Sequence, residues 1–230
     1  MERILVVDDE KEIADLIEVY LQYENYIVFK CNSAQEALHC IKTQELDLAI
    51  IDIMMPEIDG LTLCKEIRKS HIFPIIMLTA KGSELDKING LTLGADDYVT
   101  KPFKPLELMA RVKAQIRRYT QFSRAGMNAI ESSVLEYEGL LLDTERYECF
   151  VDGAVVDLTP TEFSILRLLM ENKGKVVSAE TLFQGVWKDE CYNKNSSTMT
   201  VHIRHIREKL NDTGEKPVYI KTVWGVGYRI

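Results

Sequence analysis

The sequence predicts an α/β fold in which a five-stranded, doubly wound parallel sheet is followed by a smaller α+β domain. Short apolar runs alternate with helical patterns through residues 1–118, an order that builds a parallel sheet with helices on both faces. In residues 135–230 the order changes to strands, three helices and a hairpin. The 230 residues suffice for two domains of ordinary size.

Apolar runs predict the strands of the first domain, and the amphipathic stretches between them predict its helices. The strands are expected at Ile4–Val7, Ile27–Phe29, Leu48–Ile51, Ile75–Leu78 and Tyr98–Val99. The helices are expected around residues 10–24, 33–43, 61–70, 83–92 and 105–118. Such a sheet places its ligand site at the C-terminal ends of the strands.

The helical pattern breaks after Arg118, so residues 119–134 are predicted to form a linker to a second domain at 135–230. Short strands are expected early in that domain, including Cys149–Val151 and Val155–Leu158, which an Asp152-Gly153 turn would join. The domain therefore begins with antiparallel strands.

Helix signals follow these strands. Thr159 is predicted as an N-cap, with Pro160 in the first turn, Glu162 completing a capping box and Gly174 past the end. A second short helix should follow Ser178, and a third should run from about 197 to 210. The last segment, PVYIKTVWGVGYRI, reads as a hairpin.

Composition narrows the class of protein. A hydrophobic content of 46% with 28% charged residues is typical of a globular chain. The five cysteines form no CxxC pair, which argues against a disulfide framework or a zinc site and fits a reducing cytosol. No signal peptide and no apolar run of ~20 residues is present. We therefore expect a cytoplasmic protein without direct membrane insertion.

The formal net charge of −8 hides an uneven distribution. Residues 135–190 hold twelve acidic and five basic side chains, a net charge of −7. Residues 191–230 hold three acidic and seven basic side chains, a net charge of +4. Because partner choice follows local charge, DNA is a candidate partner of this C-terminal segment.

Chemistry-bearing side chains follow the predicted strands. Asp8 and Asp9 follow the first strand, Asp52 the third, Thr79 the fourth and Lys101 the fifth. These strand ends meet at one edge of a parallel sheet, and clustered carboxylates with oxygen ligands suit Mg²⁺. A lysine and a hydroxyl beside such a site can neutralise and hydrogen-bond a phosphoryl group. Asp52 can then act as a nucleophile that forms an aspartyl phosphate.

Each of these residues also has a purely structural interpretation. Asp9 and Glu12 have the spacing of a capping box, and Asp52 could serve the Pro-containing turn that follows it. Thr79 could simply end a strand, and Lys101 could be a solvated charge. Their joint appearance, in order and at successive strand ends, favours the phosphoryl-transfer interpretation.

The segments ILVVDDE, DIMMPEIDG, IIMLTAK and GADDYVTKPF resemble the receiver domain of two-component response regulators across residues 1–118. The resemblance implies Asp52 as phosphoacceptor, Asp8 and Asp9 as acidic-pocket residues, and the backbone of Met54 as a further Mg²⁺ ligand. It implies Thr79 and Tyr98 as the switch and Lys101 as the phosphate contact, with a cis Lys101-Pro102 bond. Glu57 departs from the family pattern, where many members carry Gly.

Two enzyme classes compete with this interpretation. An aspartyl-phosphate phosphotransferase or phosphatase of the haloacid-dehalogenase type needs a second Asp two residues after the nucleophile, where this chain has Met54. A P-loop enzyme needs GxxxxGK[ST], which is missing. We therefore expect a chain that is not an enzyme and catalyses only its own phosphorylation and dephosphorylation.

The third helix of the second domain has the pattern of a DNA-reading helix. Met199, Ile203, Ile206 and Leu210 form its predicted core stripe. The opposite face is expected to show Ser197, Thr200, Val201, Arg204, His205 and Glu208. Val201 suits contact with a thymine methyl, and Arg204 and His205 suit base edges or phosphates. Arg207 and Lys209 flank this face and suit contacts with the DNA backbone. The alternative is an ordinary solvated helix face.

LTPTEFSILRLLMENKG, TVHIRHIREKL and IKTVWGVGYRI resemble the winged-helix output domain of OmpR/PhoB-type regulators. The resemblance implies that the third helix enters the major groove of double-stranded promoter DNA and that the hairpin reaches the minor groove. Trp224 stands at a hairpin position where some members place an arginine. KDECYNKNS corresponds to a loop that can touch RNA polymerase. PTEFSILRLLMENKGKVVS and TVHIRHIREKLNDT resemble the regulators of vancomycin-resistance systems, which implies a role in antibiotic resistance.

The receiver resemblance also implies a sensor histidine kinase as partner and a symmetric homodimer formed on phosphorylation. The implied ion pairs are Lys87–Glu107, Asp97–Arg111 and Asp96–Arg118, around Ile88, Leu91 and Ala110. Glu107 and Arg111 are also i,i+4 neighbours, so a pair within one helix is the alternative.

Overall fold

The structure is a computed structural model that describes residues 1–80, 94–124, 134–187, 198–214 and 217–230. It contains two compact units, Met1–Tyr119 and Thr120–Ile230. Within the described ranges no helix is long and apolar enough to cross a membrane.

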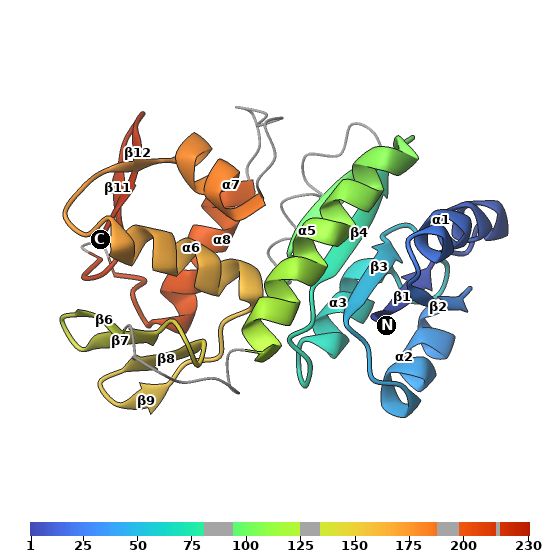
Figure 1. Cartoon of the computed structure of the whole chain (residues 1–230), viewed down its shortest axis with the longest axis horizontal. Coiled ribbons are helices and arrows are strands. Elements are labelled where there is room, and N and C mark those ends of the chain that lie inside the picture. The colour runs from blue at the N-terminus through green and yellow to red at the C-terminus, as the bar shows by residue number, and fades with distance from the viewer. Residues whose placement is uncertain (81–93, 125–133, 188–197, 215–216) are drawn as a thin grey trace. The chain divides into compact units, whose positions relative to one another are not determined.

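The first unit is built on a five-stranded parallel sheet, as the sequence predicts (Figure 1). The order of its strands is β2-β1-β3-β4-β5. Their bounds are β1 Arg3–Val7, β2 Ile27–Cys31, β3 Leu48–Asp52, β4 Ile75–Ala80 and β5 Asp97–Lys101. Every residue of β3 is buried, which is the expected state of a central strand covered on both faces.

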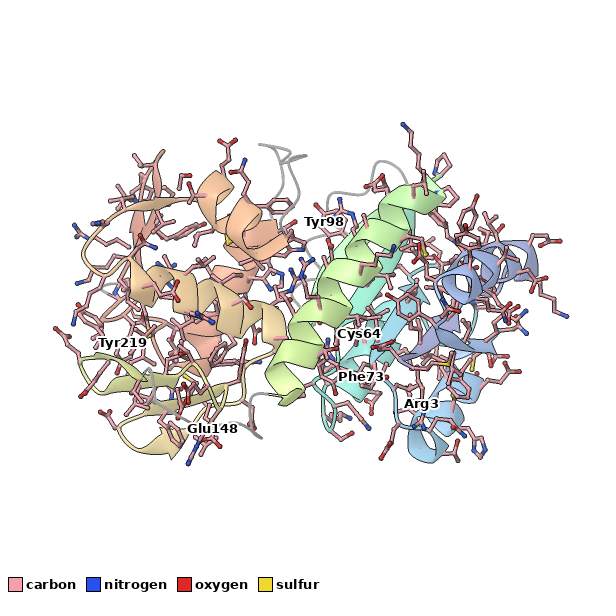
Figure 2. All side chains as sticks on the ribbon, in the orientation of Figure 1. Arg3, Cys64, Phe73, Tyr98, Glu148 and Tyr219 are labelled. Atoms are coloured by element: carbon pink, nitrogen blue, oxygen red, sulfur yellow. The ribbon has the colours of Figure 1, made fainter. Side chains whose placement is uncertain are left out.

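Helices cover both faces of this sheet. Their bounds are α1 Lys11–Tyr23, α2 Ala34–Thr43, α3 Gly60–Ile67 and α5 Pro105–Arg124. The apolar sides of α1 and α5 share one core with Ile4 and Val6 of β1, whereas α2 and α3 share another with Leu5 and Val7 (Figure 1). Successive residues of β1 point to opposite faces of the sheet and thus pack alternately into the two cores. Cys64 and Phe73, labelled in Figure 2, belong to the α2–α3 side and are buried.

Helix α5 continues past its predicted end at Arg118 to Arg124, so the predicted linker begins inside a helix. The reason is local, since residues 119–124 contain neither proline nor glycine to stop the helix. The helix predicted around 83–92 lies outside the described residues.

The second unit begins with a four-stranded antiparallel sheet in the order β6-β7-β8-β9. The bounds are β6 Val134–Tyr137, β7 Leu140–Asp143, β8 Glu148–Val151 and β9 Ala154–Val155. The turn at Asp152-Gly153 has positive φ at both residues, as a tight hairpin requires. The predicted strand at Val155–Leu158 is wrong beyond Val155, because the chain leaves the sheet before it enters the next helix.

Three helices and a second small sheet complete this unit. The helices are α6 Pro160–Glu171, α7 Ala179–Trp187 and α8 Thr198–Lys209. The sheet has the order β10-β12-β11, from Val177–Ser178, Gly227–Arg229 and Lys221–Val223. The capping box predicted at Thr159 and Glu162 is confirmed, and so is the C-terminal hairpin. One apolar core joins the three helices to both sheets.

Candidate functional site

The ends of β1 and β3 bring three carboxylates together. Val7 pairs with Ile51 in the parallel ladder, so Asp8 and Asp52 follow at neighbouring positions. One carboxylate oxygen from each of Asp8, Asp9 and Asp52 lies within 4.8 Å of the others. Asp8 and Asp52 are buried, at 0% and 3% exposure, whereas Asp9 is exposed. The three carboxylates therefore meet at one edge of the sheet, as the sequence predicts.

The side chain of Lys101, the last residue of β5, reaches the carboxylates of Asp8 and Asp52. Its Nζ lies 2.9 Å from Asp8 Oδ2, 3.2 Å from Asp52 Oδ2 and 3.5 Å from Glu10 Oε1. The Lys101-Pro102 peptide bond is cis, as the resemblance implies. We call the group formed by Asp8, Asp9, Asp52 and Lys101 the acidic pocket.

Burial dominates the electrostatics of the acidic pocket. It raises the pKa of both Asp8 and Asp52, and the charge of Lys101 only partly offsets this effect. Burial also lowers the pKa of Lys101, but its hydrogen bond to Asp8 and the charges of both carboxylates outweigh burial and raise the pKa on balance. Three carboxylates beside one ammonium leave excess negative charge. The residues therefore fit a hard divalent cation bound through oxygen.

The structural alternative for Asp9 is wrong. Helix α1 has Glu10, not Asp9, as its N-cap, and no side chain accepts a capping hydrogen bond there. Asp8 Oδ1 instead accepts a hydrogen bond from the Glu10 amide at 3.0 Å. The Asp9 carboxylate is instead one of the three that come together at the ends of β1 and β3.

The turn after Asp52 holds that residue in place. The backbone amide of Met54 donates to the Asp52 carboxylate, and the Met54 side chain is 66% exposed. Glu57 has φ +65°, a left-handed conformation that explains why glycine suits this position. Its carboxylate accepts a hydrogen bond of 2.9 Å from Gln35. Gly60, at the start of α3, packs directly against the Asp52 backbone.

The two predicted switch residues lie on adjacent strands. Thr79 is in β4 and is buried, and its Oγ1 lies 3.5 Å from the Ala80 carbonyl oxygen. Tyr98 is in β5, is half-buried and packs against the core on the α2–α3 side (Figure 2). Their role as a switch stays a prediction.

Acidic residues predicted to pair across a dimer have partners inside the chain. Asp96 is fully buried and accepts a hydrogen bond from Arg68 of the same chain at 2.6 Å. Its pair with Arg118 of a second copy stays a prediction. Arg111 lies 3.1 Å from Asp97 and 3.2 Å from Glu107, as the single-chain alternative expects. The remaining predicted interface positions are Ala110, which is exposed, Arg118, which is 7% exposed, and Lys87, Ile88 and Leu91, which lie outside the described residues.

In the second unit, Glu162 connects α6 to α8. It is 2% exposed, and its Oε2 accepts from Lys209 at 2.7 Å and from the Thr159 amide at 2.8 Å. The His205 Nδ1 lies 3.7 Å from its other oxygen. Burial raises the pKa of Glu162, but the charge and hydrogen bond of Lys209, with the Thr159 amide and His202, lower it on balance. The network fixes α8 on the start of α6.

We expect Glu162→Gln to destabilise the second unit at neutral pH by about 2–4 kcal/mol, because it uncouples Lys209 and weakens the cap. Since the folded pKa of Glu162 is lowered, its contribution is present above the ordinary value of 4.5 and is lost as pH falls through the folded pKa. Denaturant titration read by Trp187 and Trp224 fluorescence measures this, because both tryptophans lie in the second unit.

Glu171→Gln, which removes an exposed partner of Arg167, is the control and should cost less than about 1 kcal/mol. If Glu162→Gln costs no more than this control, the network does not stabilise the unit.

The exposed face of α8 differs from the prediction. The core stripe of Met199, Ile203, Ile206 and Leu210 is confirmed. Val201 and His205, predicted to face outward, are 5% and 7% exposed, which corrects that expectation. A helical wheel with a single core stripe misses His205, because the partner of that side chain is Glu162 at the start of α6.

Four predicted DNA-contacting residues do remain at the surface. Thr200 and Arg204 are exposed, Arg207 is half-buried, and Trp224 at the hairpin turn is 90% exposed. Arg204 bonds Glu208 at 2.8 Å, whereas Arg207 bonds the Ile220 carbonyl at 2.6 Å. The Lys209 side chain is 37% exposed, and its Nζ is held by the buried Glu162. Ser197 lies outside the described residues.

Comparisons with known proteins match a family in each unit. Residues 4–113 match the family described as response regulator receiver domain, and residues 153–230 match the family described as transcriptional regulatory protein, C terminal. The whole chain is 59% identical to regulatory protein VanR of Enterococcus faecium, covering 98% of it. It is 40% identical over 99% of its length to the alkaline phosphatase synthesis transcriptional regulatory protein PhoP of Bacillus subtilis, covering 96% of it.

Solved structures are also similar to this chain over its whole length. A mutant of RitR superimposes with a TM-score of 0.75 at 27% identity, with 100% of this chain and 99% of the other covered. Thermotoga maritima DrrB, described as an OmpR/PhoB homolog, gives 0.52 at 32% identity, with 100% and 98% covered. The similarity therefore extends over both units of the chain.

Proposed function

We propose specific residue roles for this chain, which belongs to the two-component response regulators with a winged-helix output domain of the OmpR/PhoB type. It is a phosphorylation-dependent transcriptional regulator. Its receiver domain implies a histidine kinase as partner, and its winged helix implies DNA binding. The haloacid-dehalogenase alternative is not favoured.

Asp52 is the proposed phosphoacceptor. The observation that carries this assignment is the position of Lys101 Nζ, 2.9 Å from Asp8 and 3.2 Å from Asp52 in a largely buried pocket. A carboxylate oxygen of Asp52 forms the bond to phosphorus while the bond from phosphorus to the imidazole nitrogen of the kinase phosphohistidine breaks. Lys101 then pairs with the new phosphoryl oxygens, and the Thr79 hydroxyl donates a hydrogen bond to one of them.

Receiver domains generally bind Mg²⁺ at such an acidic pocket. Asp8, Asp9 and Asp52, with the backbone carbonyl of Met54, would hold the ion here. When bound, Mg²⁺ supplies the positive charge that the three carboxylates and the incoming phosphoryl group need. The chain's own contribution is to orient Asp52 and to keep Lys101 beside it, so that the chain promotes its own phosphorylation and dephosphorylation.

The output is proposed to follow from a population shift. Phosphate at Asp52 draws in Thr79, Tyr98 turns inward, and the face of β5 and α5 favours a symmetric dimer through Asp97, Glu107 and Arg111. In the structure Arg111 pairs with Asp97 and Glu107 of its own chain, so these pairs must exchange partners on dimerisation. Asp96 and Arg118 are proposed as a further pair across the dimer, for which Asp96 would have to exchange Arg68 of its own chain for Arg118 of the second copy.

The winged-helix domain is proposed to bind double-stranded promoter DNA. Thr200 and Arg204 on α8 would face the major groove, and Trp224 on the hairpin would face the minor groove. RNA polymerase is proposed as a further partner through the loop before α8, which lies outside the described residues. The 59% identity to VanR supports glycopeptide (vancomycin) resistance genes as targets.

A test of the coupling uses the full chain with and without a small phosphodonor and Mg²⁺. Phosphorylated protein should sediment as a dimer and bind its preferred duplex at least tenfold more tightly, because two linked domains engage two half-sites. That duplex is selected with the phosphorylated chain from a random-sequence pool. A phosphorylated monomer that binds DNA no better than unphosphorylated protein would refute the coupling.

A further inference from the structure

The basic side chains on α8 differ in how firmly the protein holds them. Arg207 donates two hydrogen bonds to the Ile220 carbonyl oxygen and one to Thr222. The partner of Lys209 is the buried Glu162. Arg204 instead pairs with Glu208 one turn further along the helix, and both side chains are largely exposed, at 63% and 45%. Arg204 is thus the one of these three cations whose described partner is exposed.

The carboxylate of Glu208 lies on the surface proposed to bind DNA, where a negative charge is unfavourable for binding. It lines a hollow of about 970 Å³ together with Arg204, Arg207, Lys221, Thr222 and Trp224. The hollow lies between α8 and the C-terminal hairpin, the two elements proposed to contact DNA. A carboxylate there repels phosphates of any sequence. It also competes with DNA for the guanidinium of Arg204.

We propose that Glu208 is a specificity-determining residue that restrains Arg204 until a matching base edge accepts it. The inference rests on the proposed function of α8. An exposed i,i+4 ion pair is weak, so a bidentate contact between Arg204 and a guanine can replace it. A single contact with a phosphate replaces it less well. Glu208 therefore lowers the affinity for non-specific DNA more than the affinity for specific DNA. The difference between these two affinities, which defines specificity, becomes larger.

The test compares wild type with Glu208→Gln in the full chain. One probe is the duplex that wild-type protein enriches from a random-sequence pool, and the other is an unrelated duplex of the same length. Glu208→Gln is expected to bind the unrelated duplex about three- to fivefold more tightly at low salt, with a smaller gain on the enriched duplex. Its salt dependence on the unrelated duplex should steepen by about 0.9, the slope of one added phosphate contact.

Two further variants identify the mechanism. Glu171→Gln breaks the matched i,i+4 pair with Arg167 on α6, whose Nε–Oε1 distance is 2.7 Å, and should leave both affinities unchanged. In the Arg204→Gln background the effect of Glu208→Gln should largely disappear, because the released guanidinium is missing.

The outcomes separate the inference from the function on which it rests. An equal gain without Arg204 would show repulsion of phosphates alone and would overturn the restraint of Arg204. No change in Glu208→Gln, or the same change in Glu171→Gln, would overturn the role of Glu208. If wild-type protein enriches no duplex at all, the proposed DNA-binding function itself fails.

Discussion

Asp52→Asn is expected to abolish phosphorylation of the chain by a small phosphodonor. Wild-type protein should gain the mass of one phosphoryl group in the presence of Mg²⁺, and none when EDTA removes the ion. The amide of asparagine lacks the nucleophilic carboxylate, although it is close in size and sits at the same buried strand end, where the side chain is 4% exposed. Intact-mass measurement reads the result directly.

Asp59→Asn is the matched control. Asp59 is exposed, lies in the same loop and caps α3 by accepting a hydrogen bond of 2.7 Å from the Thr62 amide. Asparagine caps helices about as well as aspartate, so the fold should persist. This variant should be labelled as fully as wild type. Equal labelling of Asp52→Asn and wild type would remove Asp52 as phosphoacceptor.

Gly60→Ala is expected to damage both the stability and the chemistry of the receiver domain. A Cβ at Gly60 would lie 2.0 Å from the carbonyl oxygen of Asp52 and 3.0 Å from Ile53 Cα. Both neighbours are backbone atoms, so no side-chain rotation can relieve the clash. We expect a loss of roughly 3 kcal/mol in the free energy of unfolding, together with slower Mg²⁺-dependent labelling, because the clash moves Asp52 itself.

Gly185→Ala is a control with the opposite expectation. Its Cβ would meet Leu168 Cδ1 at 2.7 Å, the far end of a flexible side chain, and alanine is the better helix former. The expected change in unfolding free energy is within about 1 kcal/mol. Chemical denaturation followed by far-UV circular dichroism compares the two variants. If Gly60→Ala unfolds like wild type and is labelled at the same rate, the close approach at Asp52 does not constrain the pocket.

Local sequence signals determined much of the fold. Buried strands followed from apolar runs, and α6 began where Thr159 and Glu162 predicted, because a capping box satisfies the first amides of the helix within four residues. Convergence of Asp8, Asp52 and Lys101 was also predictable, because parallel strands carry their C-terminal ends to one edge whatever packs around them.

The exposed face of α8 does not follow from the sequence of that helix alone. Periodicity identified its core stripe, yet Val201 and His205 are buried on the opposite side of the wheel. The pattern along one helix reports its own apolar residues and cannot count the neighbours that pack on it. Only the assembled unit shows that α6 brings Glu162 against His205 and Lys209.

The sequence by itself thus determined the order of elements, the family and the residues that converge at the sheet edge. Only the tertiary structure decided which charges are already paired, as Arg68 with Asp96, 28 residues apart, and Lys209 with Glu162, 47 residues apart. The physical reason is the distance along the sequence over which each interaction acts. Strand burial and helix capping depend on neighbours in sequence, whereas the partner of a charge depends on which distant side chain the packing brings within hydrogen-bond distance.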